Sequence, residues 1–197
     1  MNLKRNIILV GTMGSGKSHV GRNLADALQW QFVDTDRVLE KRYGVPIAVI
    51  YRKLGEKAFR RAEQDVLRRV AKYHEAVISV GGNFPLETRT IRFIRKYGYV
   101  VGVHAADYRI VSRVSRRIGK RPTMDYKDTP AYVAAMAERW RPIYKRCDML
   151  VDTTNGRTDD HIEAIAERIL KDGVEFKSRK QSGGTAHEYL GCIDKRR

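Results

Sequence analysis

Short apolar runs alternate with longer amphipathic stretches over most of this chain. Each run reads as a buried strand, and each stretch repeats its apolar residues with the period of an α-helix. This alternation is typical of βαβ units, in which successive strands lie parallel in one sheet. The expected strands are residues 6–10, 31–33, 76–80, 99–103 and 149–152. The expected helices are residues 17–28, 37–43, 47–54, 59–73, 85–95, 106–117, 132–144 and 158–171.

The hydrophobic period ends after Gly173. At 197 residues the chain is long enough for one well-buried α/β domain and too short for two of ordinary size. The last stretch is polar and basic, a composition that does not form a core. We therefore expect one folded domain over residues 1–173 and a basic, flexible tail over residues 174–197.

The chain contains no apolar run long enough to cross a membrane as a helix. Residues 1–5 lead directly into the first strand, without the apolar centre of a signal peptide. The cysteines, Cys147 and Cys192, are far apart and match no metal-ligand spacing, as expected of free thiols in a reducing compartment. These features predict a cytoplasmic protein with no membrane contact.

The formal net charge of +16 indicates an anionic partner or ligand. Nucleic acid is one candidate, because clusters of Lys and Arg neutralise phosphates. The positive residues are spread along the chain, however, and no RNA- or DNA-binding module accompanies them. An enzyme with small anionic substrates also benefits from a positive site. We therefore expect small-anion chemistry rather than nucleic-acid binding.

Residues 11–18, Gly-Thr-Met-Gly-Ser-Gly-Lys-Ser, fit the pattern G-x-x-x-x-G-K-[S/T] of a phosphate-binding loop between a strand and a helix. Glycines let the backbone curl so that its N–H groups face a phosphate chain, and the start of the helix adds a positive field. Lys17 can bridge the outer phosphates, and Ser18 can bind Mg²⁺. A glycine-rich turn without a ligand is the alternative. The expected nucleotide-binding residues of the loop are Gly11, Gly14, Ser15, Gly16, Lys17 and Ser18.

Two carboxylates follow the second expected strand. Asp34 and Asp36 stand at its carboxyl end, beside the strand that feeds the phosphate loop, where parallel sheets bind ligands. Asp36 could instead cap the helix that begins near Arg37. Gly81 and Gly82 end the third expected strand, and they permit either close approach of a ligand to the backbone or a tight turn.

A polar, cationic segment, residues 118–130, joins two expected helices. Segments of this length in compact domains are often lids that close over a substrate. The helix that follows ends among basic residues, Arg139 and Arg141 included. On an earlier helix, Arg60 and Glu63 are three residues apart and can pair on one face.

These motifs occur in the order and spacing of the shikimate kinase family, which the chain resembles over residues 4–171. They are the phosphate loop, Asp34-Thr35-Asp36, Gly55-Glu56 with Phe59-Arg60-x-x-Glu63, Gly81-Gly82, Lys120-Arg121-Pro122 and Pro142-Ile143-Tyr144. The resemblance implies a three-layer P-loop kinase fold like that of nucleoside monophosphate kinases. Its five-stranded parallel sheet would have the order 2-3-1-4-5, with helices on both faces, a lid and a substrate-binding subdomain.

The resemblance also implies an activity. Shikimate kinases use ATP and Mg²⁺ to phosphorylate the 3-hydroxyl of shikimate, a step towards chorismate and the aromatic amino acids. By this resemblance, Ser18 and Asp34 would hold Mg²⁺, and Asp36 would contact the hydroxyl and accept its proton. Lys17 and Arg121 would neutralise charge on the transferring phosphoryl group. We expect a monomer whose partner is this small molecule.

Further site residues follow from the same resemblance. Arg60 would bind the shikimate carboxylate, and Gly81 and Gly82 would add backbone contacts. His19 and Arg117 would bind the nucleotide, Arg117 by stacking on the adenine.

The chain departs from the family pattern in several places. His19 replaces the usual Thr, and Asn83 replaces the last of three glycines. The lid reads Arg-Pro-Thr-Met where two leucines are common. The family's arginine two residues before Pro-Leu-Tyr is Trp140 here, and we expect Arg139 or Arg141 to take over its role.

Two other functions remain open. Asn83 and Trp140 also suit a kinase of another small hydroxylated compound, such as gluconate or a nucleoside monophosphate, and gluconate offers a carboxylate to Arg60. The excess charge and the basic tail also suit a nucleotide-binding regulator, or a nucleic-acid-associated protein, without turnover. The complete set of loop and acidic residues argues against this last function, because a protein without turnover has no chemical need of it.

Overall fold

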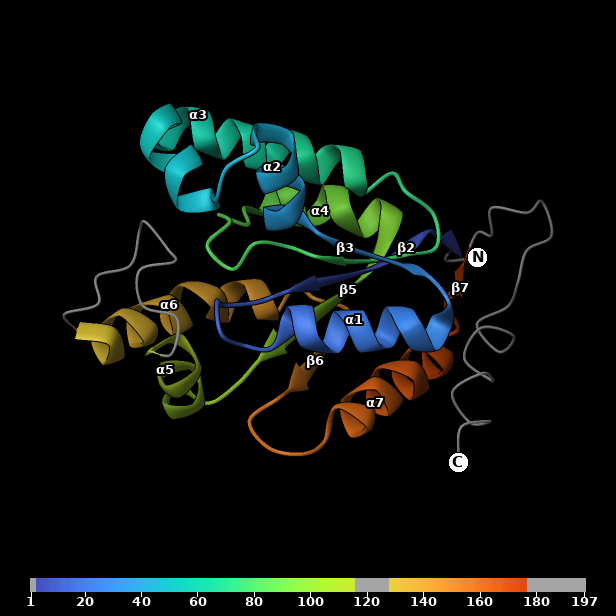
Figure 1. Cartoon of the computed structure of the whole chain (residues 1–197). Helices are drawn as coiled ribbons and strands as arrows, with labels where there is room; N and C mark the ends of the chain where they lie inside the picture. Colours follow the sequence, from blue (N-terminus) through green and yellow to red (C-terminus); the bar gives the residue numbers. More distant parts are fainter. Residues whose placement is uncertain (1–2, 116–127, 177–197) are drawn as a thin grey trace.

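The computed structural model describes residues 3–115 and 128–176 (Figure 1). The main strands are β2 (Asn6–Val10), β3 (Gln31–Asp34), β4 (Ala76–Ser79), β5 (Gly98–His104) and β6 (Met149–Asp152). They form one five-stranded sheet, parallel throughout, in the order β3-β4-β2-β5-β6. Numbered among themselves along the chain, the strands have the order 2-3-1-4-5. The predicted fold class and strand order are confirmed.

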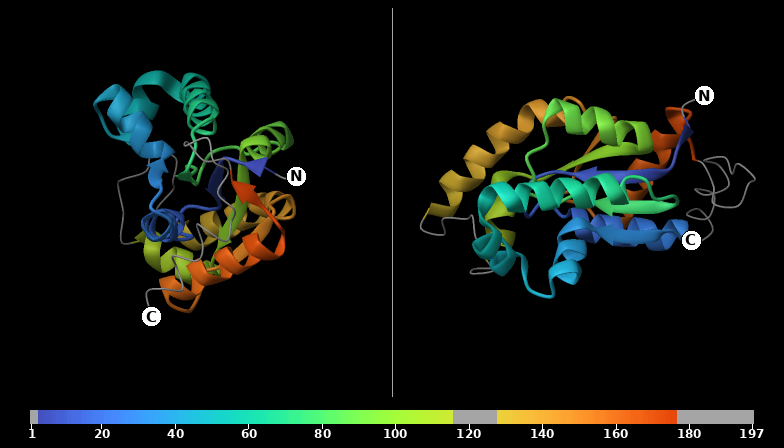
Figure 2. Two further views of the ribbon diagram at one scale, coloured as in Figure 1. Left: turned by 90° about the vertical axis from the view of Figure 1, so that its right-hand side faces the viewer. Right: turned by 90° about the horizontal axis from the view of Figure 1, so that it is seen from above.

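The central strand β2 sends its side chains alternately into two cores. Ile7 and Leu9 pack against α1 (Lys17–Leu28) and α7 (Thr158–Lys171). Ile8 and Val10 face the other core, which is formed by α2 (Thr35–Tyr43), α3 (Ile47–Val70), α4 (Thr88–Tyr97) and part of α6 (Thr129–Tyr144). All four side chains are fully buried, as expected when helices cover both faces of a parallel sheet. Figure 2 shows the sheet between these helical layers.

A third, smaller core lies at the end of the sheet where β2 enters the phosphate loop. It joins α5 (Asp107–Ser115) to α6 through Ile110, Val114 and Val133, and Met13 of the loop packs against it. The phosphate loop therefore packs, through Met13, against the core that α5 and α6 form.

Helix α2 begins two residues earlier than predicted, because a different residue caps it. The Asp34 side chain accepts hydrogen bonds from the backbone N–H groups of Asp36 and Arg37. The cap considered for Asp36 is thus made by Asp34. The predicted break after residue 54 is present as a kink at Gly55, whose φ of 73° and ψ of 166° interrupt α3.

Two other helices start away from their predicted positions. Helix α4 starts at Thr88 rather than at residue 85, and the chain before it forms an irregular turn. Helix α6 starts at Thr129 rather than at residue 132, because Asp128 caps it by accepting a hydrogen bond from the backbone N–H of Ala131. Most of the segment predicted as a lid lies outside the described residues. In residues 3–115 and 128–176, no helix is long and apolar enough to span a bilayer.

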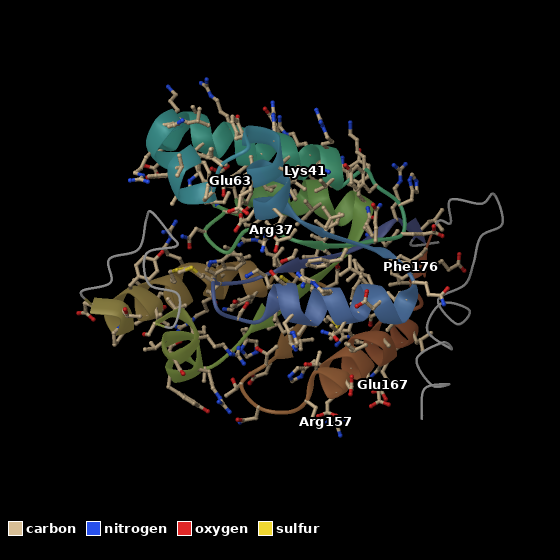
Figure 3. The ribbon with its side chains drawn as sticks, in the orientation of Figure 1. Arg37, Lys41, Glu63, Arg157, Glu167 and Phe176 are labelled. Carbon is tan, nitrogen blue, oxygen red and sulfur yellow. The ribbon has the colours of Figure 1, made fainter. Side chains whose placement is uncertain are left out.

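The described fold continues beyond Gly173, the residue at which the predicted domain ends. Strand β7 (Glu175–Phe176) pairs in parallel with β1 (Leu3–Lys4) and extends the fold beyond α7. Phe176 is 2% exposed and lies beside the C-terminal end of α1 (Figure 3), with its ring centroid 5.0 Å from that of Trp30. A two-residue strand is too short to show a period, which is why the pattern did not reveal it. Residues 177–197 of the predicted tail lie outside the described residues.

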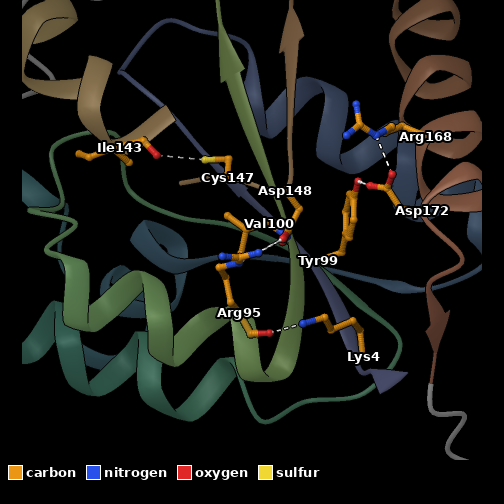
Figure 4. A network of polar contacts seen from close by, with 9 residues as sticks. All are labelled: Lys4, Arg95, Tyr99, Val100, Ile143, Cys147, Asp148, Arg168 and Asp172. Carbon is orange, nitrogen blue, oxygen red and sulfur yellow. Dashed lines mark hydrogen bonds and ion pairs between the residues drawn. The ribbon is translucent and has the colours of Figure 1, made fainter. Parts of the chain in front are cut away.

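A polar network ties together the strand ends remote from the phosphate loop (Figure 4). The Asp148 carboxylate accepts hydrogen bonds from the Arg95 guanidinium, 2.6 Å away, and from the backbone N–H of Val100, 2.8 Å away. Beside it, the Tyr99 hydroxyl donates to Asp172 over 2.5 Å, and Arg168 pairs with the same carboxylate. These contacts fix α4 and α7 to the sheet.

Candidate active site

The phosphate loop has the backbone that its glycines allow. A Cβ on Gly11 would lie 2.0 Å from the carbonyl oxygen of Val103, and Gly16 has a left-handed φ of 91°. Helix α1 begins immediately afterwards at Lys17, so its first N–H groups point into the loop. The buried Lys17 Nζ donates to the carbonyl oxygens of Gly11, at 2.8 Å, and Thr12, at 2.7 Å. An anion over this loop would meet both an ammonium group and a helix N-terminus.

A brace that sequence reasoning missed holds the loop from α5. Arg113 donates from Nη1 to the carbonyl oxygen of Gly14, at 3.1 Å, and from Nη2 to that of Thr153, at 2.9 Å. The Thr153 hydroxyl in turn donates to the carbonyl oxygen of Ser15 over 2.6 Å. Burial lowers the pKa of Arg113. No local motif predicts these contacts, because they join segments far apart in the sequence.

The two residues predicted to hold Mg²⁺ lie together at the carboxyl ends of the strands. Ser18 Oγ donates to Asp34 Oδ2 over 2.8 Å and lies 3.3 Å from Ser79 Oγ. Oxygen ligands of this kind suit Mg²⁺, which takes few ligands from protein and completes its shell with phosphate and water. The donor set therefore fits the ion. Ser79, at the end of β4, carries no motif and was not predicted.

The glycine pair after β4 joins the aspartate to the phosphate loop. A Cβ on Gly81 would lie 2.5 Å from Asp36 Oδ1, and a Cβ on Gly82 would lie 2.5 Å from the backbone nitrogen of Met13. The Gly81 N–H donates to Thr35 Oγ1 over 3.0 Å, which fixes the turn against α2. Asp36 and Met13 of the phosphate loop therefore each lie against one of two consecutive residues that carry no side chain.

Arg60 is held at the same end of the sheet by two acceptors. Its Nη1 donates to Glu63 Oε2 over 2.8 Å and to the carbonyl oxygen of Asn83 over 3.0 Å. Glu63 is 6% exposed and points in from α3 (Figure 3). The Tyr132 hydroxyl of α6 donates to Asn83 Oδ1 at 3.4 Å. Asn83 thus links Arg60 to α6. A glycine at this position would keep the backbone contact with Arg60 and lose the side-chain contact with Tyr132.

The arginines on either side of Trp140 face different ways. Trp140 is buried at 4% exposure, and its ring centroid is 5.6 Å from that of Tyr144. At about 100° per residue, Arg139 lies about 20° around the helix axis from Tyr132, and Arg141 lies about 180° from it. Arg141 pairs with Glu138 at 2.6 Å and lines a hollow on the far side of α6. Arg141 therefore lies on a different side of α6 from Tyr132, which contacts Asn83.

The remaining predicted residues fall into two groups. His19 Nε2 lies 2.9 Å from Thr158 Oγ1, and this contact joins the first turn of α1 to the first turn of α7 beside the phosphate loop. Arg117 and Arg121, predicted for adenine stacking and phosphate neutralisation, lie outside the described residues.

Comparison with known proteins identifies the relatives of this chain. The family model described as shikimate kinase matches residues 13–172. A shikimate kinase of Thermus thermophilus is 34% identical over 165 residues, which cover 84% of this chain and 90% of that protein. Among solved structures, the shikimate kinase of Acinetobacter baumannii in complex with shikimate has a TM-score of 0.80 at 28% identity and covers 87% of this chain and 96% of that one. A gluconokinase from Sinorhizobium meliloti 1021 has a TM-score of 0.56 at 16% identity, a likeness of fold alone.

Proposed function

Because this chain belongs to the shikimate kinase family, we propose that it transfers the γ-phosphoryl group of ATP to the 3-hydroxyl of shikimate, giving shikimate 3-phosphate and ADP. One observation supports this most directly. The Asp36 carboxylate and Met13 of the phosphate loop lie against consecutive residues, Gly81 and Gly82, so a donor bound by the loop would lie near Asp36.

The donor side is built to hold a polyphosphate. The N–H groups of the loop and of the start of α1 would bind the phosphate oxygens, and Lys17 would exchange its contacts with Gly11 and Thr12 for the outer phosphates. Mg²⁺ held at Ser18 and Asp34 would neutralise charge between the β- and γ-phosphates. Phosphoryl transfer needs little beyond such positioning and charge neutralisation. We assign Arg121 the same neutralising role and Arg117 the adenine contact, both from the family pattern.

The acceptor side supplies a proton acceptor. In the proposed step, the 3-hydroxyl oxygen forms a bond to the γ-phosphorus while the bond from that phosphorus to the β-phosphate oxygen breaks. The hydroxyl proton passes to Asp36, and the carboxylate later returns it to solvent. Asp34, rather than Asp36, caps α2, and Asp36 lies beside Gly81 at the proposed acceptor side.

The orientation of shikimate rests on Arg60. Glu63 and the Asn83 carbonyl hold Nη1 of its guanidinium and Glu56 lies 3.9 Å from Nε, which leaves the N–H groups of Nη2 to bind a carboxylate. We propose Arg139 as the second contact for that carboxylate, because it shares a side of α6 with Tyr132 and Arg141 does not. Replacing Arg139 with Gln should raise KM for shikimate several-fold, and Arg141→Gln is the matched control, expected to leave KM unchanged.

Two further assignments complete the proposal. We propose that the protein acts as a monomer. We propose that it acts in the cytoplasm, where ATP is available. Small-anion chemistry accounts for part of the positive charge, and nucleic acid has no role in the proposed reaction.

A coupled assay of ADP release tests the proposal. We expect release to depend strongly on shikimate, and we expect gluconate, which also offers a carboxylate to Arg60, to support little. Asp36→Asn should lower turnover by about 10²- to 10⁴-fold while ADP still binds. Release with gluconate but not shikimate would instead identify a kinase of another acceptor. Nucleotide binding without turnover, together with salt-sensitive DNA binding, would identify a regulator.

A further inference from the structure

The hollow that Arg141 lines adjoins the proposed transfer site, on the opposite side of α6 from Tyr132. Its volume is about 390 Å³, within the range of pockets that hold small organic ligands. The walls come from the start of the phosphate loop, the end of β5, the first turns of α5, the end of α6 and one residue of β6. Figure 1 shows these elements gathered at one end of the sheet. We call this hollow the α5–α6 pocket.

Most of the wall is apolar. It is formed by Ala105, Ile110, Ala137 and Leu150, together with the ring of Tyr144. Leu150 is 48% exposed, although its neighbours in β6, Met149 and Val151, are buried. The rings of His104 and Tyr144 are 5.9 Å apart across the end of β5. A flat, apolar group in this pocket would cover Leu150 and contact both rings.

A buried hydroxyl provides the second, independent observation. Thr12 lines the pocket and is 3% exposed, yet its hydroxyl has no hydrogen-bond partner among the described residues. Buried polar side chains in proteins almost always have a partner. A polar atom of a ligand in the pocket would supply that partner once Thr12 turns its hydroxyl, which is not solvent-accessible in this structure, towards the pocket.

The charges at the pocket favour an anion. Arg141 and Lys145 stand one turn apart on α6, and both line the pocket, while Asp107 at the start of α5 is the acidic side chain among the lining residues. Glu138 pairs with Arg141 at an exposed position. Lys145 adds a second cation beside that pair. A carboxylate at this rim would meet two cationic side chains.

We propose that the α5–α6 pocket binds a small aromatic carboxylate, with its ring against Tyr144 and Leu150 and its carboxylate at Lys145. A polar substituent on the ring completes the hydrogen bonding of Thr12. This site is separate from the one proposed for shikimate, which lies across α6 beside Arg60.

Occupation of the pocket reaches the phosphate loop through two contacts. The Tyr144 hydroxyl donates to the carbonyl oxygen of Val103 over 3.2 Å and accepts from the backbone N–H of Thr12 over 3.3 Å. A ligand that shifts Tyr144 or engages Thr12 therefore acts on the first residues of the loop. By thermodynamic linkage, the pocket ligand changes the affinity for nucleotide by the same factor by which nucleotide changes the affinity for the pocket ligand.

Calorimetric titration of the full chain with 4-hydroxyphenylacetate tests the binding site. We expect saturable binding, with a Kd in the millimolar range, that persists when shikimate is saturating. Its uncharged analogue, 4-hydroxyphenylacetamide, should bind several-fold more weakly. Ala137→Phe, which fills the pocket, should weaken binding of the acid at least ten-fold, and Lys145→Gln should weaken it by about five-fold. Ala134→Phe is the matched control, because Ala134 is an exposed residue of α6 outside the pocket lining.

The outcomes separate this site from the transfer site, and none requires turnover. Competition by shikimate would place the probe at Arg60 and overturn the proposal. Equal binding by the Ala137→Phe variant, or absence of saturation by about 50 mM, would also overturn it. The coupling is tested by titrating ADP with and without saturating probe. We expect the Kd for ADP to change at least two-fold in the parent protein and to stay constant in Ala137→Phe, and an unchanged Kd in the parent would refute the link through Tyr144.

Discussion

Replacing Gly81 with Ala should displace the Asp36 carboxylate without disturbing the fold. The added Cβ would lie 2.5 Å from Asp36 Oδ1, whereas ordinary contacts begin near 3.4 Å, so the carboxylate must move by about 0.9 Å. Gly81 has no left-handed φ, and alanine therefore adds no backbone strain there. A misplacement of about 1 Å in a reacting group can cost about 10²-fold in rate. We expect a loss of turnover of that size.

The assay compares turnover with nucleotide affinity in two neighbouring variants. Turnover is measured by shikimate-dependent ADP release, and the Kd for ADP by calorimetry. Gly81→Ala should lower turnover and leave the Kd for ADP within about two-fold of the parent value. In Gly82→Ala the new Cβ would lie 2.5 Å from the backbone nitrogen of Met13, so this variant should weaken ADP binding as well.

The reasoning fails if Gly81→Ala turns over like the parent protein. It also fails if ADP affinity falls as far as turnover, because the substitution would then act through the phosphate loop and not through Asp36. Thermal melting of both variants provides the control for folding.

Three further predictions concern the loop brace, acid stability and a buried thiol. Arg113→Gln removes the contact with the Gly14 carbonyl and should raise KM for ATP by about ten-fold, as measured with shikimate saturating, while the helix content in circular dichroism stays unchanged. The hydrogen bond from Tyr99 lowers the pKa of Asp172, so this carboxylate stabilises the fold above about pH 4 and the stability is lost as pH falls through the lowered value. Urea titrations between about pH 2 and 7 should show a weaker acid dependence in Tyr99→Phe, and an identical profile would exclude this pair. Burial raises the pKa of Cys147 to about 12, so in a variant whose other cysteine is serine, iodoacetamide should modify the native protein far more slowly than the urea-unfolded chain at about pH 7.5. Equal rates would show that the thiol is accessible.

The sheet was predictable because its strands are short, apolar and bounded by turn residues. Ile7, Ile8, Leu9 and Val10 are fully buried by helices on both faces, and side chains in that environment are mostly apolar. Strand β7 escaped prediction because two residues cannot show a period, although Phe176 is as buried as the residues of β2.

The site was predictable where residues carry their chemistry in a local motif. The phosphate loop and Asp34 follow fixed spacings from a strand end, and the structure brings Ser18 and Asp34 within hydrogen-bond distance. Arg113 and Thr153 carry no such motif, because their contacts with the loop depend on how α5 and β6 pack against it.

Helix register distinguishes two arginines that composition left equivalent. The sequence offered Arg139 and Arg141 equally as replacements at Trp140, since both have the required guanidinium. Burial of Trp140 fixes the rotation of α6, and this rotation turns the two arginines to different surfaces. The sequence therefore predicts that an arginine is present on α6. The direction in which each arginine points follows only from the packing of the helix.

The pairing of Leu3–Lys4 with Glu175–Phe176 closes the described chain upon itself at the pole away from the phosphate loop (Figure 1). A surface linker joined directly to either of these two strands would leave the protein at that pole. The described domain would then be held there with its reacting groups facing the solution.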